Sequence, residues 1–148
     1  MKQKKIKILP IRANDKKAFE SCRRIRTDVF INEQEVEEEE EFDEFEEESQ
    51  HYLLLLDETA IGTARWRRTE KGVKLERFAI LAAYRGNKYG ELLLSKVIED
   101  ATNAGDYLYL HAQLKAVNFY GRQGFKKVGP QFEECNIWHY KMELKTNT

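Results

Sequence analysis

Short apolar runs alternate along this chain with segments in which apolar residues recur every three or four positions. The first pattern is typical of β-strands, and the second is typical of amphipathic helices. Strands are predicted at residues 5–9, 51–56, 60–68, 73–81, 107–112, 125–128 and 138–144. Helices are predicted from Asn14 or Asp15 to Phe30, and at residues 88–104 and 116–123. The first strand is expected to end at Pro10, and Gly105 is expected to stop the long helix.

The order of these elements predicts how the strands are connected. Short turns join the second, third and fourth strands, so these three strands should form an antiparallel meander. A helix lies between the fourth and fifth strands, so these two should run parallel to each other. The last two strands should form an antiparallel pair. We find no internal repeat and no domain linker, which favours a single domain over residues 1–148.

Composition is typical of a globular protein that needs no cofactor or disulfide to fold. The chain has 148 residues, of which 41% are hydrophobic and 34% are charged. No apolar run is long enough to cross a membrane or to form the core of a signal peptide, so we expect a cytoplasmic protein. Cys22 and Cys135 lack the spacing of a metal site or a redox pair, so reduced thiols and no metal are expected.

The net charge of −1 conceals a strongly acidic segment. Twelve acidic residues and no basic ones lie between Glu33 and Glu48, and the remainder holds 25 basic and 14 acidic residues. Such like-charge blocks are usually disordered or solvated, although Phe42 and Phe45 could attach this one to the body of the protein. Because the basic residues are scattered and no nucleic-acid motif accompanies them, a small polyanionic ligand explains them better than nucleic acid.

A short turn between the fourth strand and the long helix carries the clearest chemical signal. It contains Arg85, Gly86, Asn87, Lys88 and Gly90, and the helical pattern starts there at once. The first amides of a helix have no partner within it, and the helix dipole adds roughly half a positive charge there. Such a turn binds phosphate. It lacks the P-loop pattern and the glycine spacing of a dinucleotide fingerprint, so a nucleotide-binding module is the weaker interpretation.

Two motifs and the order of elements resemble the GNAT superfamily of acyl-CoA-dependent N-acetyltransferases. That family binds the CoA pyrophosphate with a turn of the form Arg/Gln-x-x-Gly-x-Gly/Ala, and residues 85–90 read Arg-Gly-Asn-Lys-Tyr-Gly. The family also has an Asn near Phe-Tyr and then Gly-Phe, and residues 118–125 read Asn-Phe-Tyr-Gly-Arg-Gln-Gly-Phe. The resemblance, to a small bacterial branch, covers roughly residues 6–144. It implies an α/β GNAT fold: a mixed, mostly antiparallel sheet with helices on both faces, splayed between the fourth and fifth strands to admit acyl-CoA.

The resemblance also implies an activity and the residues that perform it. The activity is transfer of an acetyl group from acetyl-CoA to a primary amine of a small molecule or protein, by direct attack. Tyr120 matches the tyrosine that protonates the CoA thiolate, and aromatic packing is its alternative role. Glu76 lies where the family often has a carboxylate base, and a salt bridge is its alternative role. The implied cofactor-binding residues are Phe78, Ala79, Ile80, Arg85, Gly86, Asn87, Lys88, Tyr89, Gly90, Glu91 and Asn118.

Other residues are weaker candidates for the chemistry. Glu33 could face the acceptor site from the end of the first helix. Histidines titrate in the useful range; a structural role is favoured for each of His51, His111 and His139, although His111 begins a His-Ala-Gln motif beside the cofactor strand. Cys135 has no evident activating partner in the sequence, and the family uses no acyl-enzyme, so we do not expect a nucleophilic cysteine.

Lys88 departs from the family pattern because it stands where the middle glycine would be. We expect it to adopt helical backbone angles and to point to solvent while its amide binds; the alternative is that its side chain pairs with the pyrophosphate.

The resemblance to the GNAT fold implies that the acidic segment borders the acceptor entrance. It could attract a cationic amine such as a polyamine, an aminoglycoside or a lysine side chain, or it could be only a solvated face. The rival function is a non-catalytic acyl-CoA-binding regulatory domain. We expect a monomer or homodimer with neither a nucleic-acid nor a membrane partner.

Overall fold

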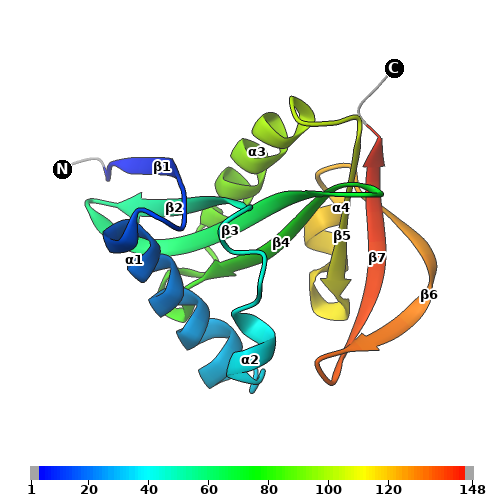
Figure 1. Cartoon of the computed structure of the whole chain (residues 1–148), viewed down its shortest axis with the longest axis horizontal. Coiled ribbons are helices and arrows are strands. Elements are labelled where there is room, and N and C mark those ends of the chain that lie inside the picture. Colours follow the sequence, from blue (N-terminus) through cyan, green and yellow to red (C-terminus); the bar gives the residue numbers. More distant parts are fainter. Residues whose placement is uncertain (1–3, 146–148) are drawn as a thin grey trace.

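The computed structural model describes residues 4–145, and they form one sheet of seven strands (Figure 1). The strands lie in the order β1-β2-β3-β4-β5-β7-β6. Their bounds are β1 Ile6–Ile11, β2 Gln50–Leu56, β3 Thr59–Thr69, β4 Gly72–Ile80, β5 Tyr107–Gln113, β6 Lys126–Glu134 and β7 Ile137–Lys145. Within the described residues β4 and β5 are the only parallel neighbours, which confirms the mixed, mostly antiparallel sheet.

Within the described residues, four α-helices and three other helical segments connect the strands. The α-helices are α1 Lys16–Arg26, α2 Glu38–Glu41, α3 Tyr89–Thr102 and α4 Val117–Gly121. The π-helical η1 (Thr27–Glu33) continues α1, and η2 (Ala82–Tyr84) and η3 (Leu114–Ala116) are 3₁₀ turns. Asp15 caps α1 through its side chain, which accepts a hydrogen bond from the amide of Ala18 at 3.3 Å. No helix in this part of the chain is long and apolar enough to cross a membrane.

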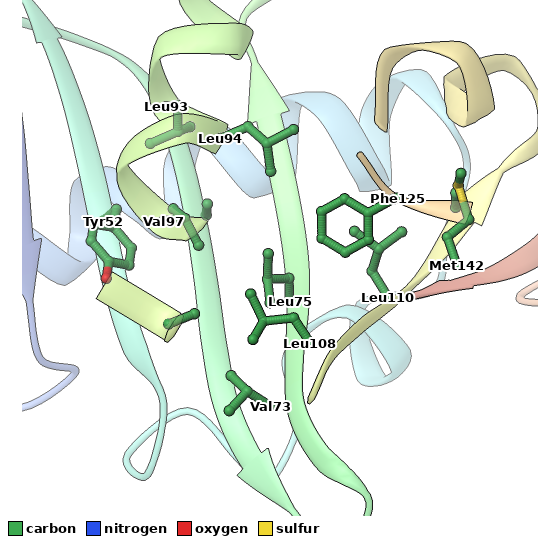
Figure 2. Packing of buried hydrophobic residues seen from close by; sticks show 13 residues of the cluster. Tyr52, Val73, Leu75, Leu93, Leu94, Val97, Leu108, Leu110, Phe125 and Met142 are labelled. Atoms are coloured by element: carbon green, nitrogen blue, oxygen red, sulfur yellow. The ribbon is translucent and has the colours of Figure 1, made fainter. Parts of the chain in front are cut away.

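The helices cover both faces of the sheet, as expected. On one face, Cys22 and Ile25 of α1 pack with Leu53 and Ala79 of the sheet. On the opposite face, α3 packs on β4 and β5 (Figure 2). The buried positions of α3 follow its helical period, and they are Leu93, Leu94, Val97 and Ala101.

The prediction that the first strand ends at Pro10 is wrong. Pro10 pairs with Tyr52 inside β1, and the strand continues to Ile11. Because β1 is the edge strand of the sheet, an amide that faces outward there has no strand to bind, and proline is tolerated.

The parallel pair β4–β5 opens partway along its length. Three residue pairs join the two strands, from Val73 with Leu108 to Leu75 with Leu110. Beyond Leu75 the two strands are no longer paired. On its other side β4 remains paired to β3 as far as Ile80, across a bulge at Arg77, whose φ is +60°. Residues 76–80 of β4 therefore have one edge without a strand partner, which is the predicted splay.

Residues 33–48, the acidic segment, fold against the sheet instead of extending into solvent. Nine of its twelve carboxylates are exposed, and Glu41, Asp43 and Glu46 are not. The expectation of a disordered or solvated run is therefore wrong for these three residues. The segment includes α2, which lies beside the end of α1 in Figure 1.

Two buried arginines account for this folding. Arg26 of α1 and Arg65 of β3 are 1% and 0% exposed. Arg26 donates from Nε to Glu41 at 2.7 Å and from both terminal nitrogens to Glu46 at 2.8 Å. Arg65 donates to both oxygens of Asp43, at 2.9 and 2.7 Å, and to Glu46 at 2.9 Å. Glu46 thus joins the two arginines, and each guanidinium meets carboxylates in the geometry that it binds best.

Further contacts hold the rest of the acidic segment. Arg77 donates to the backbone carbonyl of Glu41 at 3.2 Å. The aromatic ring of Phe42 lies 4.8 Å from the guanidinium carbon of Arg26. Similarly, the aromatic ring of Phe45 lies 3.8 Å from the guanidinium carbon of Arg67. The suggestion that Phe42 and Phe45 attach the segment to the body is therefore correct, and arginines are what they attach to.

Removing one of the buried arginines should strongly destabilise the folded protein. Arg65→Ala leaves Asp43 without its main partner and removes one partner each from Glu46 and the buried Glu76, so we expect a loss of about 3–5 kcal/mol in the free energy of unfolding by urea. Arg68→Ala is the matched control because Arg68 is exposed on the same strand, and its loss should stay below about 0.5 kcal/mol. Equal losses in the two variants would show that the ion pairs do not hold the acidic segment.

The protein should lose stability in mild acid because of His51. Its ring is 1% exposed, and burial lowers its pKa to about 4 from 6.5. As the pH falls below 6.5, His51 binds a proton in the unfolded chain but stays neutral in the folded chain. The free energy of unfolding therefore falls with the pH. We expect a loss of about 2 kcal/mol between pH 7 and pH 5. His51→Phe keeps a ring against Phe19, and its urea midpoint should change much less; an unchanged pH dependence would contradict this origin.

Candidate active site

A cavity of about 570 Å³ lies where β4 and β5 separate. Its walls come from η1, α2, the open end of β4, β5, α4 and the turn between β6 and β7. In Figure 1, α2 and this turn lie at the same end of the molecule. Glu76, Phe78 and Tyr120 all line the cavity, so the structure brings both predicted catalytic residues to one space.

The predicted anion-binding turn has free backbone donors. From Gly86 to Glu91, six consecutive amides donate no hydrogen bond to any described residue. Four of them are at the start of α3, which spans 14 residues, so its dipole adds to their positive potential. Gly86 has φ +82°, and a Cβ built on it would meet nothing within 4 Å. The turn is thus open toward a ligand, and its donors fit a phosphate group.

The two sequence motifs meet in space through Gly90. A Cβ built there would lie 3.4 Å from two ring atoms of Phe119 in α4. The start of α3 therefore lies next to Phe119 of α4. Tyr120 follows on α4, and its ring centroid lies 6.0 Å from that of Phe78 on β4. Of the predicted cofactor residues, Ala79 is buried and Asn118 is exposed on α4.

Lys88 does not have the helical backbone angles that we expected. Its φ is +67° and its ψ is +13°, which is the left-handed conformation, and it is the residue that precedes α3. Glycine adopts this conformation without strain, which explains the glycine at this position of the family motif. The side chain of Lys88 is exposed, as expected.

Arg85 already has partners on the protein. Its Nε donates to the carbonyl of Ile80 at 2.8 Å, and its two terminal nitrogens donate to the carboxylate of Glu33, each at 2.9 Å. These hydrogen bonds lower the pKa of Glu33. Arg85 thus ties the anion-binding turn to the end of β4 and to η1. Glu33 faces this arginine and is not among the residues that line the cavity.

Tyr120 lies among other aromatic rings. Phe119 and Phe125 contact it at centroid distances of 5.1 and 6.1 Å, in addition to Phe78. Burial raises the pKa of its hydroxyl above the ordinary value, so the hydroxyl keeps its proton at neutral pH. Among residues 4–145 it forms no hydrogen bond. The hydroxyl is therefore a proton donor with no internal acceptor.

Glu76 is strongly ion-paired. It is 9% exposed, and it lies 2.9 Å from Arg65, 2.8 Å from Arg67 and 3.2 Å from Lys74. Burial alone would raise its pKa, but these cations, Arg65 foremost, lower the pKa to about 2. A carboxylate with so low a pKa is a weak acceptor for a proton from an ammonium group.

Sequence reasoning considered His111 but missed the carboxylate that it approaches in the cavity wall. His111 of β5 approaches Glu134 of β6, with its Nδ1 3.2 Å from a carboxylate oxygen. Nothing in the sequence marks Glu134, because it lies in a stretch that showed no strand pattern. Cys135 follows it, and burial raises the pKa of its thiol to about 12, so it remains a protonated thiol.

Together, the fold and the cavity define an α/β domain whose sheet opens beside a helix start with free amides. Comparison with known proteins identifies the class: a family model described as an acetyltransferase (GNAT) domain matches residues 15–146. The chain belongs to the GNAT acetyltransferase family. The resemblance stated from the sequence motifs is thereby confirmed.

Individual relatives agree with this assignment. The uncharacterized N-acetyltransferase YjcF of Bacillus subtilis is 32% identical over 120 residues, which is 80% of this chain and 86% of that protein. The crystal structure of Escherichia coli ElaA matches with a TM-score of 0.83 and 25% identity, over 94% of this chain and 99% of that one. An acyl-CoA N-acyltransferase from Pseudomonas aeruginosa gives the same values.

Replacing Lys88 by glycine should stabilise the protein. Glycine relieves the left-handed strain at this position, so we expect a gain of about 1 kcal/mol in the free energy of unfolding by urea. Lys88→Ala is the control because it removes the same charge and keeps a Cβ; it should change stability by at most about 0.5 kcal/mol. If both variants gain equally, the charge and not the backbone is responsible.

Proposed function

We propose that the protein transfers an acetyl group from acetyl-CoA to a primary amine. The observation that carries this proposal is the row of free amides from Gly86 to Glu91 beside the open edge of β4. The protonated Tyr120 faces the cavity that this open edge lines. Family membership supports acyl transfer in general. The identity of the donor as acetyl-CoA and of the acceptor as a primary amine is what we propose beyond family membership.

In this proposal the open turn holds the CoA pyrophosphate. The amides of residues 86–91 donate to it, and Asn87, Tyr89 and Gly90 supply the backbone that faces it. The side chain of Arg85 acts indirectly, because it fixes the turn against Ile80 and Glu33. The left-handed Lys88 contributes its amide, and its exposed side chain is dispensable for CoA.

The open edge of β4 holds the pantetheine arm and the acetyl group. Phe78, Ala79 and Ile80 lie beyond the last register with β5, so on that side their backbone groups can pair with an extended ligand, as an added strand would. Asn118 lies on α4, beyond this edge. The proposal thus positions the thioester between β4 and Tyr120.

The reaction is then a direct attack by the amine nitrogen on the thioester carbonyl carbon. A C–N bond forms, the tetrahedral intermediate is stabilised by backbone donors of β4, and the C–S bond breaks. Tyr120 gives its hydroxyl proton to the departing thiolate sulfur. Glu76 keeps its negative charge throughout the reaction. We therefore propose that it orients a water molecule or the amine and does not act as the base.

The exposed part of the acidic segment favours a positively charged acceptor. Glu39 and Glu40 line the cavity, and within the described residues neither forms an ion pair. Their charges would attract a cationic amine toward the thioester. Glu41, Asp43 and Glu46 contribute less to this attraction, because Arg26, Arg65 and Arg77 pair with them.

An amine panel tests the function and its rival. Acetyl-CoA is incubated with polyamines, aminoglycosides, lysyl peptides and uncharged primary amines, while free thiol is measured at low and high salt. Thiol release with cationic amines, weakened by salt, supports the proposal. Binding of CoA without thiol release from any amine would favour a non-catalytic acyl-CoA-binding regulatory domain. A thermal shift with ATP but not with CoA would refute CoA binding itself.

Removing the Tyr120 hydroxyl should slow turnover and leave binding intact. We expect Tyr120→Phe to lower kcat about 100-fold because the thiolate then leaves without a proton donor. The thermal shift that CoA produces should be unchanged, since the ring and its aromatic contacts remain. Tyr140→Phe makes the same change on β7 outside the cavity and should keep full activity. A fall in kcat no larger than that of the control would assign Tyr120 to packing alone.

A further inference from the structure

Acetylation of an ammonium group needs a proton acceptor, and the ion pairs of Glu76 make it a weak one. A second titratable pair lines the same cavity: His111 in the centre of the sheet and Glu134 at the end of β6. We propose, on the basis of the proposed function, that His111 is the general base that removes the proton of the acceptor amine, and that Glu134 positions it.

The geometry of the pair sets the tautomer of the imidazole. The Nδ1 atom of His111 lies 3.2 Å from the Glu134 carboxylate, which can only accept a hydrogen bond when ionised. In the neutral ring Nδ1 therefore carries the proton, and Nε2 presents its lone pair. A carboxylate that holds a histidine in this way also stabilises the imidazolium that forms when Nε2 takes a proton.

The ring is held in place and remains accessible. Phe132 of β6 contacts it edge-on, with ring centroids 4.9 Å apart. The side chain of His111 is 25% exposed, in contrast to the buried His51. His111 lies on β5, on the same face as Tyr109 and Gln113 and opposite to the buried Leu110 and Ala112. This face is the floor of the cavity.

The charges around His111 favour this role. Glu134 faces it from β6, Lys74 from β4, and His139 and Lys141 from β7. The hydrogen bond from His111 is the main reason why the pKa of Glu134 lies below its usual range, so Glu134 remains negative whenever the enzyme works. Lys74 is paired with Glu76 at 3.2 Å, which limits its repulsion of an imidazolium.

The protons balance with this assignment. The acceptor ammonium loses one proton to Nε2 of His111, and the neutral amine then forms the C–N bond. The second proton leaves the nitrogen as the tetrahedral intermediate collapses, while Tyr120 protonates the CoA sulfur. Tyr120 recovers a proton from the nitrogen through solvent, and His111 releases its own proton to bulk water. The products are the amide, CoA thiol and one proton.

His139 is the competing residue, because it also lines the cavity. Its Nδ1 lies 2.7 Å from the carbonyl of Ile137, its ring stacks on Phe132, and it is 7% exposed. It has no carboxylate partner for its ring within the described residues. His139→Gln is therefore the matched control for His111→Gln.

The test is the pH profile of kcat/KM with the best amine of the panel, for the wild type, H111Q, H139Q and E134Q. For the wild type, kcat/KM should fall as the pH is lowered, because one group takes up a proton; this fall is the acid limb of the profile. H111Q should lower kcat/KM about 100-fold and remove this acid limb, whereas H139Q should keep it. E134Q should move the limb to lower pH, because loss of the negative charge makes His111 easier to deprotonate. Imidazole added to H111A should restore part of the rate.

Failure of this assignment is separable from failure of the proposed function. Wild-type protein that releases no thiol with any amine would overturn both. Wild-type turnover with an unchanged acid limb in H111Q would overturn only the role of His111, and an acid limb lost in H139Q instead would transfer that role to His139. A normal thermal shift with CoA in each variant shows that the fold and the CoA site are intact.

Discussion

The structure depends on the pairing of two buried arginines with carboxylates from one segment of the chain. Arg26 and Arg65 come from a helix and a central strand, and neither could stay buried as an unpaired cation. Glu41, Asp43 and Glu46 supply the neutralising charges from the acidic segment. This requirement folds the acidic segment over the sheet, and it explains why a run of like charges is ordered at all.

The same network sets the electrostatics of the active site. Arg65 donates to Asp43 and Glu46 on one side and to Glu76 on the other, so the cavity wall and the candidate catalytic strand share one guanidinium. Glu76 therefore cannot be tuned toward neutral pH without disturbing the fold. A site whose central carboxylate is committed to structure needs its proton acceptor elsewhere, and our proposal assigns that role to His111 on the neighbouring strand β5.

Much of the fold could be predicted from the sequence because its strands and helices are marked by local patterns. The free helix start after Arg85 and the helix that carries Tyr120 followed from motif spacing, and the structure brings them together. The arginine pairing could not be foreseen, since twelve neighbouring acidic residues give no sign of which three turn inward. One signal was present: Arg26 lies four residues after Cys22 on the buried helix face, where a cation needs a partner. The left-handed Lys88 was missed because its side chain gives no hint of its backbone angles.

The pair Arg85–Glu33 shows how the donor and acceptor sides of the site are linked. Arg85 belongs to the anion-binding turn, and Glu33 is both the last residue of η1 and the first of the acidic segment, which contributes to the cavity wall. The hydrogen bond from Arg85 to Ile80 adds the end of β4 to this link. The turn, the open strand and the acceptor wall are thus fixed to one another by a single guanidinium. In the proposed reaction, direct attack requires the amine and the thioester to be aligned, so this connection would serve the chemistry as well as the fold.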